Sequence, residues 1–369
     1  TIHCLIAPNS SSGARESWGQ RVLRGKTMKY ALFGLITSSI LSIVGCTKTD
    51  STQAGVERPI KIGFVLATVN EERYAKDRNY FHDAAKASGA VVGFDFCDDK
   101  VAVQTAKVET LLAKKVDVLV IQPVNGETAS AIVDMAKKDG VPVIAYDRLI
   151  KNADIDLYVT QNSFQVGALQ AEEAAKRTGG KGNYLILMGE AGHSVADEIT
   201  RGVMSVLEKH PGIKVVVKQN HPGWSTALAL STVENALTRY QNNVAAILAN
   251  NDGMALGAIQ ALEEQKLNGK VFVAGADADL AAVKDIVKGR QSMTILKGIK
   301  PLAEAAVAQA IVLAKKQTPL SDAQINNGKK MVPVVNTPVY RVVQDNIQTQ
   351  IVDYGFHSAD AVFGSGKKS

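Results

Sequence analysis

The chain has 369 residues, of which 46% are hydrophobic and 21% charged, so it can bury a large core and is longer than one ordinary domain. Its formal net charge of +6 comes mostly from the first 45 residues, which leave 37 of the 42 basic and 35 of the 36 acidic residues for the remainder. The basicity is therefore no argument for a nucleic-acid partner, and the length predicts two domains.

Residues 28–45 have the order of features found in a signal peptide. Met28-Lys29 precedes an apolar run over 31–45 that is too short to span a bilayer as a helix. The run ends in Ile43-Val44-Gly45-Cys46, which resembles a bacterial lipobox, where the cysteine is lipidated. We expect an exported protein, periplasmic or held at the membrane only through a lipid on Cys46. An ordinary secretory signal with an incidental cysteine is the alternative.

The segments beside the signal peptide are expected to lie outside the fold. Residues 1–27 precede the first Met and show no apolar periodicity, so we interpret them as an upstream extension that is disordered or absent from the mature protein. Residues 46–58 are small and polar, as in a flexible tether. With Cys4 upstream and Cys46 lipidated, Cys97 remains alone and no internal disulfide is expected.

From residue 60 onward, short apolar runs rich in β-formers alternate with helical segments. Apolar residues recur at helical spacing in stretches such as 101–115 and 226–240. Near-continuous apolar strands alternating with helices indicate parallel sheets covered on both faces. Ten strands in two runs of five predict an α/β fold of two doubly wound parallel-sheet lobes. The predicted strands are 60–66, 90–96, 117–122, 142–146, 157–160, 184–188, 214–218, 245–249, 271–274 and 292–296.

Three crossings between the lobes are expected, and together they predict a three-segment hinge. They lie near 161–164, 297–301 and 332–338, where Pro333 and Pro338 favour an extended connector over a helix. The predicted N-terminal lobe comprises 59–161 and 298–332, and the predicted C-terminal lobe comprises 162–297 and 333–369.

Polar and aromatic side chains follow several of the predicted strands. In parallel sheets of this kind, ligands bind beyond the carboxyl ends of the strands. Each sugar hydroxyl both donates and accepts a hydrogen bond, and the C–H faces of a pyranose pack on flat rings, so amides, carboxylates, cations and aromatic rings together suit an uncharged sugar. The candidate ligand-binding residues are Arg73, Tyr74, Asp147, Arg148, Asn162, Trp224, Asn251, Asp277 and Lys297.

Several of these residues also have a plainer interpretation. Asn251 precedes a predicted helix and could be its N-cap, and Asp147-Arg148 could be a solvated ion pair in a turn. Lys297 could be a surface charge at a strand end, and Trp224 could cover the edge of a core. Their occurrence together at about seven strand ends favours a binding site.

The motifs of common enzymes are missing from the chain. There is no G-x-S-x-G elbow, phosphate loop, G-x-G-x-x-G or H-E-x-x-H, and the histidines lack metal-ligand spacing. His193, near Ser194 and Glu190, is the one cluster that could suit hydrolysis. We therefore expect no catalysis, no cofactor and no metal. The sensor domain of a lactose-repressor-like regulator shares the predicted fold, but it would begin with a helix-turn-helix and lack a signal peptide.

Residues from about 60 to the C terminus resemble the periplasmic sugar-binding proteins of ABC importers with the ribose/galactose-binding fold, and most of all their xylose-binding branch. The resemblance spans nearly the whole predicted mature chain. It is carried by ERYAKDR at 72–78, VLVIQPVNG at 118–126, AYDRLI at 145–150, ADID at 153–156, Asn251-Asp252, GADADLA at 275–281 and NNG at 326–328.

This resemblance implies a type I periplasmic binding protein, a monomer that captures a monosaccharide by hinge closure and delivers it to ABC permease subunits. Presentation of the sugar to a chemoreceptor or sensor kinase is the alternative, and an enzyme acting on a sugar is less favoured. Two departures leave the preferred sugar open: Asn162 replaces an Asp of the xylose-binding branch, and HSVA at 193–196 replaces Asp-Asn-Asn-Ala. Arg73, Asp147, Arg148, Asn251, Asp277 and Lys297 match positions that hydrogen-bond the sugar, and Tyr74 and Trp224 match its aromatic sandwich.

Overall fold

The computed structural model of the chain describes residues 58–69 and 72–364. The predicted extension at 1–27, the signal peptide, Cys46 and nearly all of the tether lie outside the described residues. Of the helices in the described ranges, none has both the length and the apolar character needed to cross a bilayer.

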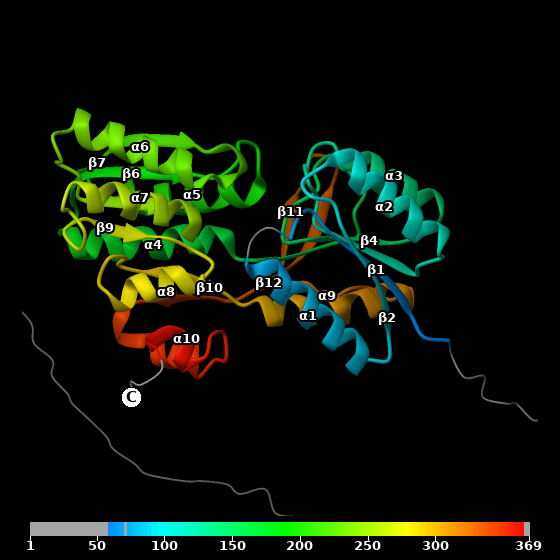
Figure 1. Cartoon of the computed structure of the whole chain (residues 1–369). Coiled ribbons are helices and arrows are strands. Elements are labelled where there is room, and N and C mark those ends of the chain that lie inside the picture. Colours follow the sequence, from blue (N-terminus) through cyan, green and yellow to red (C-terminus); the bar gives the residue numbers. More distant parts are fainter. Residues whose placement is uncertain (1–57, 70–71, 365–369) are drawn as a thin grey trace, which may run out of the picture. The chain divides into compact units, whose positions relative to one another are not determined.

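The first lobe is built on a sheet that has seven strands within the described residues, in the order β11-β12-β5-β4-β3-β1-β2 (Figure 1). Its neighbouring strands are parallel except for the antiparallel pair β11 and β12. The strands are β1 (Lys61–Leu66), β2 (Val91–Phe96), β3 (Val118–Ile121), β4 (Val143–Tyr146), β5 (Leu157–Gln161), β11 (Ala323–Asn326) and β12 (Met331–Thr337).

Helices cover both faces of this sheet, so alternate side chains of each central strand enter two different cores. Phe64 of β1 packs with α1 (Glu72–Ala87) and α9 (Ile299–Ala314). Val65, the next residue, packs with α2 (Val101–Ala113) and α3 (Ser130–Lys138) on the other face. The apolar runs that predicted these strands are thus continuous because both faces are buried.

The second lobe repeats this layering on a parallel sheet of order β7-β6-β8-β9 in the described part of the chain. Helices α4 (Ser163–Thr178) and α5 (Ser194–Leu207) cover one face, and α6 (Thr226–Arg239) and α7 (Asp252–Glu264) cover the other. A third cluster joins α8 (Leu280–Val287) to the C-terminal segment that holds η2 (Gln344–Asn346), η3 (Gln348–Val352) and α10 (Ala359–Phe363). The strands are β6 (Lys181–Met188), β7 (Gly212–Asn220), β8 (Ala246–Ala249) and β9 (Phe272–Ala274).

The last predicted strand of the second lobe is not part of its four-stranded sheet. This strand, β10 (Thr294–Lys297), pairs antiparallel with β13 (Val339–Val342). It is linked to the parallel sheet only through an isolated bridge between Ala274 and Met293 among the described residues. No local pattern predicts this arrangement, because the partner strand β13 lies about 40 residues further along the chain.

The predicted boundary of the N-terminal lobe at residue 332 is wrong. Strand β12 continues to Thr337, and its residues from Val334 pair in parallel with β5. Residues 333–337 therefore belong to the first sheet. Pro333 is tolerated there because it pairs only with Gln324 of β11 and precedes the ladder with β5, so its missing N–H costs that ladder nothing.

The chain crosses between the lobes at three points that lie close together. Asn162 follows β5, Gly298 follows β10, and Pro338 separates β12 from β13. Thr337 pairs with Gln161, and Asn162 N donates to Thr337 O at 3.4 Å. Three adjacent extended segments of this kind form a hinge, as the sequence predicted.

Cys97 is buried at the end of β2 and forms no disulfide. Burial, reinforced by Asp95, raises the pKa of its thiol to about 12. The thiol is therefore protonated and unreactive in the folded protein, as suits a small buried residue at a strand end.

Candidate ligand-binding site

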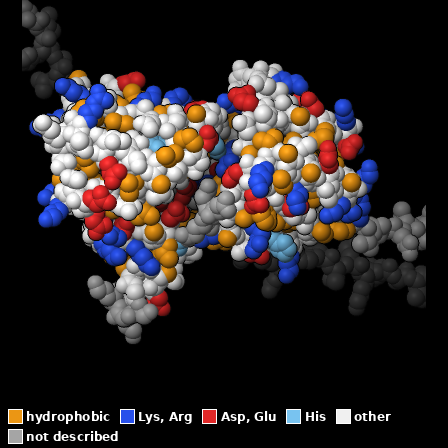
Figure 2. Space-filling view, turned by 45° about the horizontal axis from the view of Figure 1, so that its top comes forward, with side chains coloured by type: hydrophobic (Ala, Val, Ile, Leu, Met, Phe, Trp, Pro, Cys, Tyr) orange, Lys and Arg blue, Asp and Glu red, His pale blue; other side chains and the backbone are white. Residues whose placement is uncertain are grey.

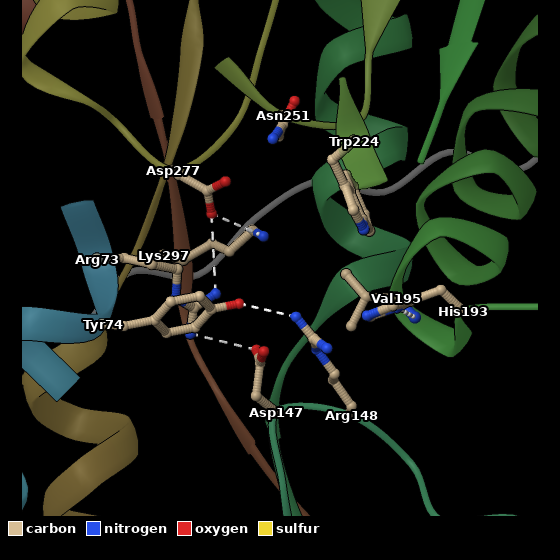
Figure 3. A pocket seen from close by; sticks show the side chains of 10 residues that line it. All are labelled: Arg73, Tyr74, Asp147, Arg148, His193, Val195, Trp224, Asn251, Asp277 and Lys297. Atoms are coloured by element: carbon tan, nitrogen blue, oxygen red, sulfur yellow. Dashed lines mark hydrogen bonds and ion pairs between the residues drawn. The ribbon is translucent and has the colours of Figure 1, made fainter. Parts of the chain in front are cut away.

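A cavity lies between the carboxyl ends of the strands of the two lobes (Figure 3). Eight of the nine predicted site residues line it, and two further residues, His193 and Val195, were not predicted. The first lobe contributes Arg73, Tyr74, Asp147 and Arg148, the second lobe contributes His193, Val195, Trp224, Asn251 and Asp277, and Lys297 stands at a crossing.

Arg73 is the centre of the charged network in this cavity. It lies in the first turn of α1 and is only 6% exposed. Its guanidinium contacts Asp77 at 3.3 Å, Asp147 at 3.3 Å and Asp277 of the second lobe at 3.9 Å. Burial opposes the positive charge, but the carboxylates, Asp147 foremost, raise the pKa of Arg73 well above its usual value. The residue is therefore a permanent donor whose direction is fixed by its partners.

Asp147 follows β4 and presents a carboxylate to the cavity. Its φ of 63° lies in the left-handed region, and its carbonyl oxygen accepts from Tyr158 Oη at 2.8 Å and Thr160 Oγ1 at 3.1 Å, which hold this turn. Gln122 Nε2 donates to Oδ2 at 2.8 Å. Burial favours the neutral acid, but nearby cations, with Arg73 the strongest, lower the pKa of Asp147. The group is therefore an ionised acceptor.

Tyr74 and Arg148 hold each other in place on the same wall. Arg148 Nη2 donates to Tyr74 Oη at 3.0 Å, and its Nη1 donates to Pro123 O at 3.3 Å. The Arg73 guanidinium carbon lies 5.3 Å from the centroid of the Tyr74 ring. The ring is thus oriented by two cations and lies at the cavity as an apolar surface for a ligand.

Trp224 provides an aromatic side chain on the opposite wall. It lies in the short helix η1 (Pro222–Trp224) at a φ of 55°, and it packs against both cores of the second lobe. A Cβ at Gly189 would lie only 2.5 Å from the indole, so glycine is required for this close approach. His193 meets the indole edge-to-face, with ring centroids 5.2 Å apart.

Asp277 joins the cations of the two lobes. Its Oδ1 contacts Lys297 Nζ at 2.8 Å and lies 3.9 Å from Arg73. The loop is strained, with a φ of 104° at Asp277 and 55° at Ala278, and hydrogen bonds from their amides to Ile295 O and Thr294 Oγ1 hold it. This backbone aims the carboxylate into the cavity (Figure 3).

Asn251 is both a helix cap and a cavity residue. Its Oδ1 accepts from Met254 N at 2.9 Å at the start of α7. The capping bond uses the oxygen, so the amide nitrogen is the group that Asn251 offers to a ligand. The two interpretations drawn from the sequence are therefore compatible.

Residues 62–318 match the model of a family described as the periplasmic binding protein domain. The chain belongs to the periplasmic binding protein family. Members of this family are exported solute-binding proteins of ABC transport rather than enzymes, in agreement with the missing catalytic motifs.

Known relatives cover most of this binding protein. A D-xylose-binding periplasmic protein of Haemophilus influenzae is 40% identical over 333 residues, which are 89% of this chain and 99% of the relative. The multiple sugar-binding periplasmic receptor ChvE of Rhizobium radiobacter is 32% identical over 326 residues, 81% of this chain and 91% of the relative. A carbohydrate transporter solute binding protein of Chloroflexus aurantiacus, solved with D-glucose, is similar at a TM-score of 0.75 and 33% identity, covering 81% and 97% of the two chains.

One predicted site residue of this binding protein lies outside the cavity. Asn162 is the N-cap of α4, where its Oδ1 accepts from Gln165 N at 3.0 Å. The residue directly follows β5 at the first crossing, so its side chain is used by the helix that begins there. The structure therefore places Asn162 outside this cavity, and its role toward a ligand stays a prediction.

The sequence patterns do not predict the cavity residues His193 and Val195 as ligand-binding residues. His193 and Val195 follow β6 across a five-residue loop, and the segment 193–196 was noted only as a departure from the xylose-binding pattern. That departure could have identified them, because a substitution at a strand end beside the ligand crevice changes the side chains that line the crevice.

Proposed function

We propose that this protein captures a monosaccharide, D-xylose or a related pyranose, in the cavity between its lobes and delivers it to an ABC permease. The composition of the cavity carries the proposal. Its lining residues include two carboxylates, three cations, one amide and two aromatic side chains, contributed by both lobes. Such a set satisfies the donors and acceptors of a neutral polyol and packs against its C–H faces.

We propose that the sugar stabilises a closed arrangement of the lobes. The first lobe, residues 59–161 and 298–337, and the second, 162–297 with the segment after Pro338, contact each other beside the residues that line the cavity. There, Leu149 N donates to Ser194 Oγ at 3.0 Å. A ligand that bridges Asp147 and Asp277 binds more tightly when both walls are near, so it shifts the equilibrium toward closure. The permease would then recognise the closed form.

Calorimetric titration of the purified protein tests this function. We expect at least one of D-xylose, D-glucose, D-ribose, L-arabinose and D-galactose to bind at micromolar Kd or tighter. Trp224→Ala should weaken that binding more than tenfold, about 1.4 kcal/mol. Tyr240→Ala, at the other end of α6 and outside the cavity, is the control and should leave the affinity unchanged. Absence of binding by every sugar in the panel would contradict the proposal.

We propose delivery to a permease rather than presentation to a chemoreceptor or sensor kinase, because the family serves ABC transport. We also propose a monomer, since a single chain supplies both walls of the cavity. Deleting the gene should abolish uptake of the bound sugar at low concentration. Loss of taxis with normal uptake would favour the receptor instead, and light scattering would report the mass of one chain.

We propose that the signal peptide at 28–45 is removed and that Cys46 carries the lipid anchor, with the tether linking it to the first lobe. Mass spectrometry of membrane-extracted protein should find lipidated Cys46 as the first residue, and Cys46→Ser should release the protein from the membrane. Recovery of a soluble, unlipidated wild-type protein would contradict the anchor without affecting the sugar site.

A further inference from the structure

His193 has a hydrogen-bond donor that no other described residue satisfies. The residue is the N-cap of α5, and its Nδ1 accepts from Val195 N at 3.3 Å, which assigns the ring proton to Nε2. Nε2 is shielded from solvent and has no hydrogen-bond partner within the described part of the chain. Because an unpaired buried donor costs about 1–3 kcal/mol, a ligand oxygen that accepts from Nε2 would remove a real penalty.

Because of the charge state of His193, the side chains in this corner of the cavity offer a ligand only hydrogen-bond donors. Burial, and then the Arg148 cation, lower the pKa of His193 to about 3, although Asp147 acts in the opposite direction. The ring is therefore neutral at physiological pH and keeps one N–H. Arg148, which lines the same part of the cavity, has donors and no acceptor. A ligand oxygen placed between these two side chains can only accept.

Val195 makes the neighbouring surface apolar. It lies in the first turn of α5, is 5% exposed and lines the cavity beside His193. Figure 3 shows both side chains between Trp224 and Arg148. A valine has no polar side-chain atom, so a hydroxyl placed against it would lose its hydration without gaining a partner.

One edge of a pentopyranose matches a donor-only corner next to an apolar surface. The ring oxygen accepts but cannot donate, and the adjacent C5 methylene carries no hydroxyl, whereas the other ring carbons carry hydroxyls that do both. We propose that His193 and Val195 orient the sugar, with its ring oxygen at His193 Nε2 and Arg148 and its C5 methylene on Val195, and thereby select pentopyranoses over hexopyranoses.

This proposal rests on the proposed sugar-binding function and deepens it. A hexopyranose in the same orientation directs its hydroxymethyl group, attached at C5, toward Val195. An apolar surface rejects an added hydroxyl only moderately, so we expect D-xylose to bind ten- to a hundredfold more tightly than D-glucose.

Titration of D-xylose and D-glucose into two variants at the same position tests the role of Val195. Val195→Thr keeps the side-chain volume and adds one hydroxyl, so it should reduce the xylose preference at least fivefold by giving the glucose hydroxymethyl a partner. Val195→Ala enlarges the cavity without adding a polar group and should leave the preference within twofold of wild type. The reverse result, with Ala reducing the preference and Thr leaving it unchanged, would overturn the proposal in favour of a size limit.

The orientation is tested with 5-thio-D-xylose, in which sulfur, a weak acceptor, replaces the ring oxygen. His193→Phe keeps an aromatic ring beside Trp224 and removes the Nε2 donor. The variant should bind D-xylose about tenfold more weakly than wild type but bind the thio sugar within twofold of wild type. An equal loss for both sugars would show that His193 does not face the ring oxygen and would overturn the proposal.

The controls separate this inference from the sugar-binding function itself. Thermal unfolding of each variant should match wild type within a few degrees, which shows that the cavity is folded. If no pyranose binds the wild type, the proposed function fails. If D-xylose and D-glucose bind the wild type equally and both Val195 variants keep that ratio, the function stands and the inference fails.

Discussion

The two walls of the cavity are held in different ways. On the first lobe, Arg73, Asp147, Arg148 and Tyr74 orient one another through ion pairs and hydrogen bonds, and all are at most 8% exposed. On the second lobe, Trp224 and Asp277 are directed into the cavity by left-handed φ values, a device that the first lobe uses only at Asp147 among these residues. Both walls nevertheless keep a buried donor for a ligand oxygen, because Arg73 Nη2 on the first and His193 Nε2 on the second have no hydrogen-bond partner among the described residues.

The largest effect is expected from removing the centre of the first wall. Arg73→Met leaves Asp77 and Asp147 buried without their strongest cation, so the free energy of unfolding should fall by about 3–5 kcal/mol. Sugar affinity should fall more than a hundredfold. Urea denaturation and calorimetric titration measure the two effects.

A matched exposed cation is the control for this variant. Lys300 pairs with Glu304 on the surface of α9 at 3.9 Å, with side chains 60% and 53% exposed. Lys300→Met should change the free energy of unfolding by less than about 0.5 kcal/mol. If Arg73→Met were equally mild, the first wall would not be a mutually supporting network.

The second wall should respond differently to loss of a charge. Asp277→Asn keeps the shape of a side chain that is 14% exposed and lies 2.8 Å from Lys297. We expect affinity for the sugar to fall at least tenfold, about 1.4 kcal/mol. The free energy of unfolding should change much less than in Arg73→Met. Comparable losses of stability in the two variants would remove the contrast between the walls.

The pH dependence of the second wall follows from His193. Its pKa is lowered from an ordinary 6.5 to about 3, mainly by burial, so between these values the unfolded chain binds a proton that the folded chain does not. This contribution to stability is complete above pH 6.5 and is lost as pH falls toward 3. His193→Gln should therefore flatten the fall in Tm between pH 7 and 5, measured by calorimetry.

Sugar affinity should behave differently from stability over the same range. His193 stays neutral in the folded protein, and the pKa of Asp147 is lowered by Arg73 in spite of burial, so neither cavity group changes charge between pH 8 and 5. The wild-type Kd should be constant there. A step in affinity near pH 6.5 would show that His193 titrates normally and is not buried against Arg148.

The smallest effect is expected at Asn162, which belongs to neither wall. Asn162→Ala removes the cap of α4 and should lower the free energy of unfolding by about 1 kcal/mol. Sugar affinity should stay within twofold of wild type, because the side chain lies outside the cavity. A tenfold loss of affinity would restore Asn162 to the ligand-binding residues.

Much of the fold and site could be predicted because, in a parallel α/β sheet, the position of a residue relative to its strand determines where it lies in the structure. Apolar runs mark strands buried on both faces, and the carboxyl ends of such strands meet at one edge, so Arg73, Asp147 and Asp277 could be placed together from the chain alone. The resemblance to the sugar-binding family added the roles of Tyr74 and Trp224, which the structure places on opposite walls.

The errors arose where a long-range contact decides the outcome. The segment 333–337 is a strand because β5 and β11 lie on the two sides of β12, whereas Pro333 and the following Pro338 favour an irregular connector locally. The place of Val195 on the cavity wall likewise depends on how α5 packs. Asn162 differs from this pattern, because its contact is a local one: its side chain caps α4 through Gln165 N and lies outside the cavity.

The position of β12 between β5 and β11 also governs the order in which the lobes can form. The four parallel strands of the second lobe lie within 181–274, so that sheet can assemble as soon as this stretch has been synthesised. The sheet of the first lobe stays open until Thr337 has left the ribosome, when nearly the whole chain has been made. Because such distant pairings form slowly, the sheet of the first lobe is completed later than that of the second, although its first strand is made first.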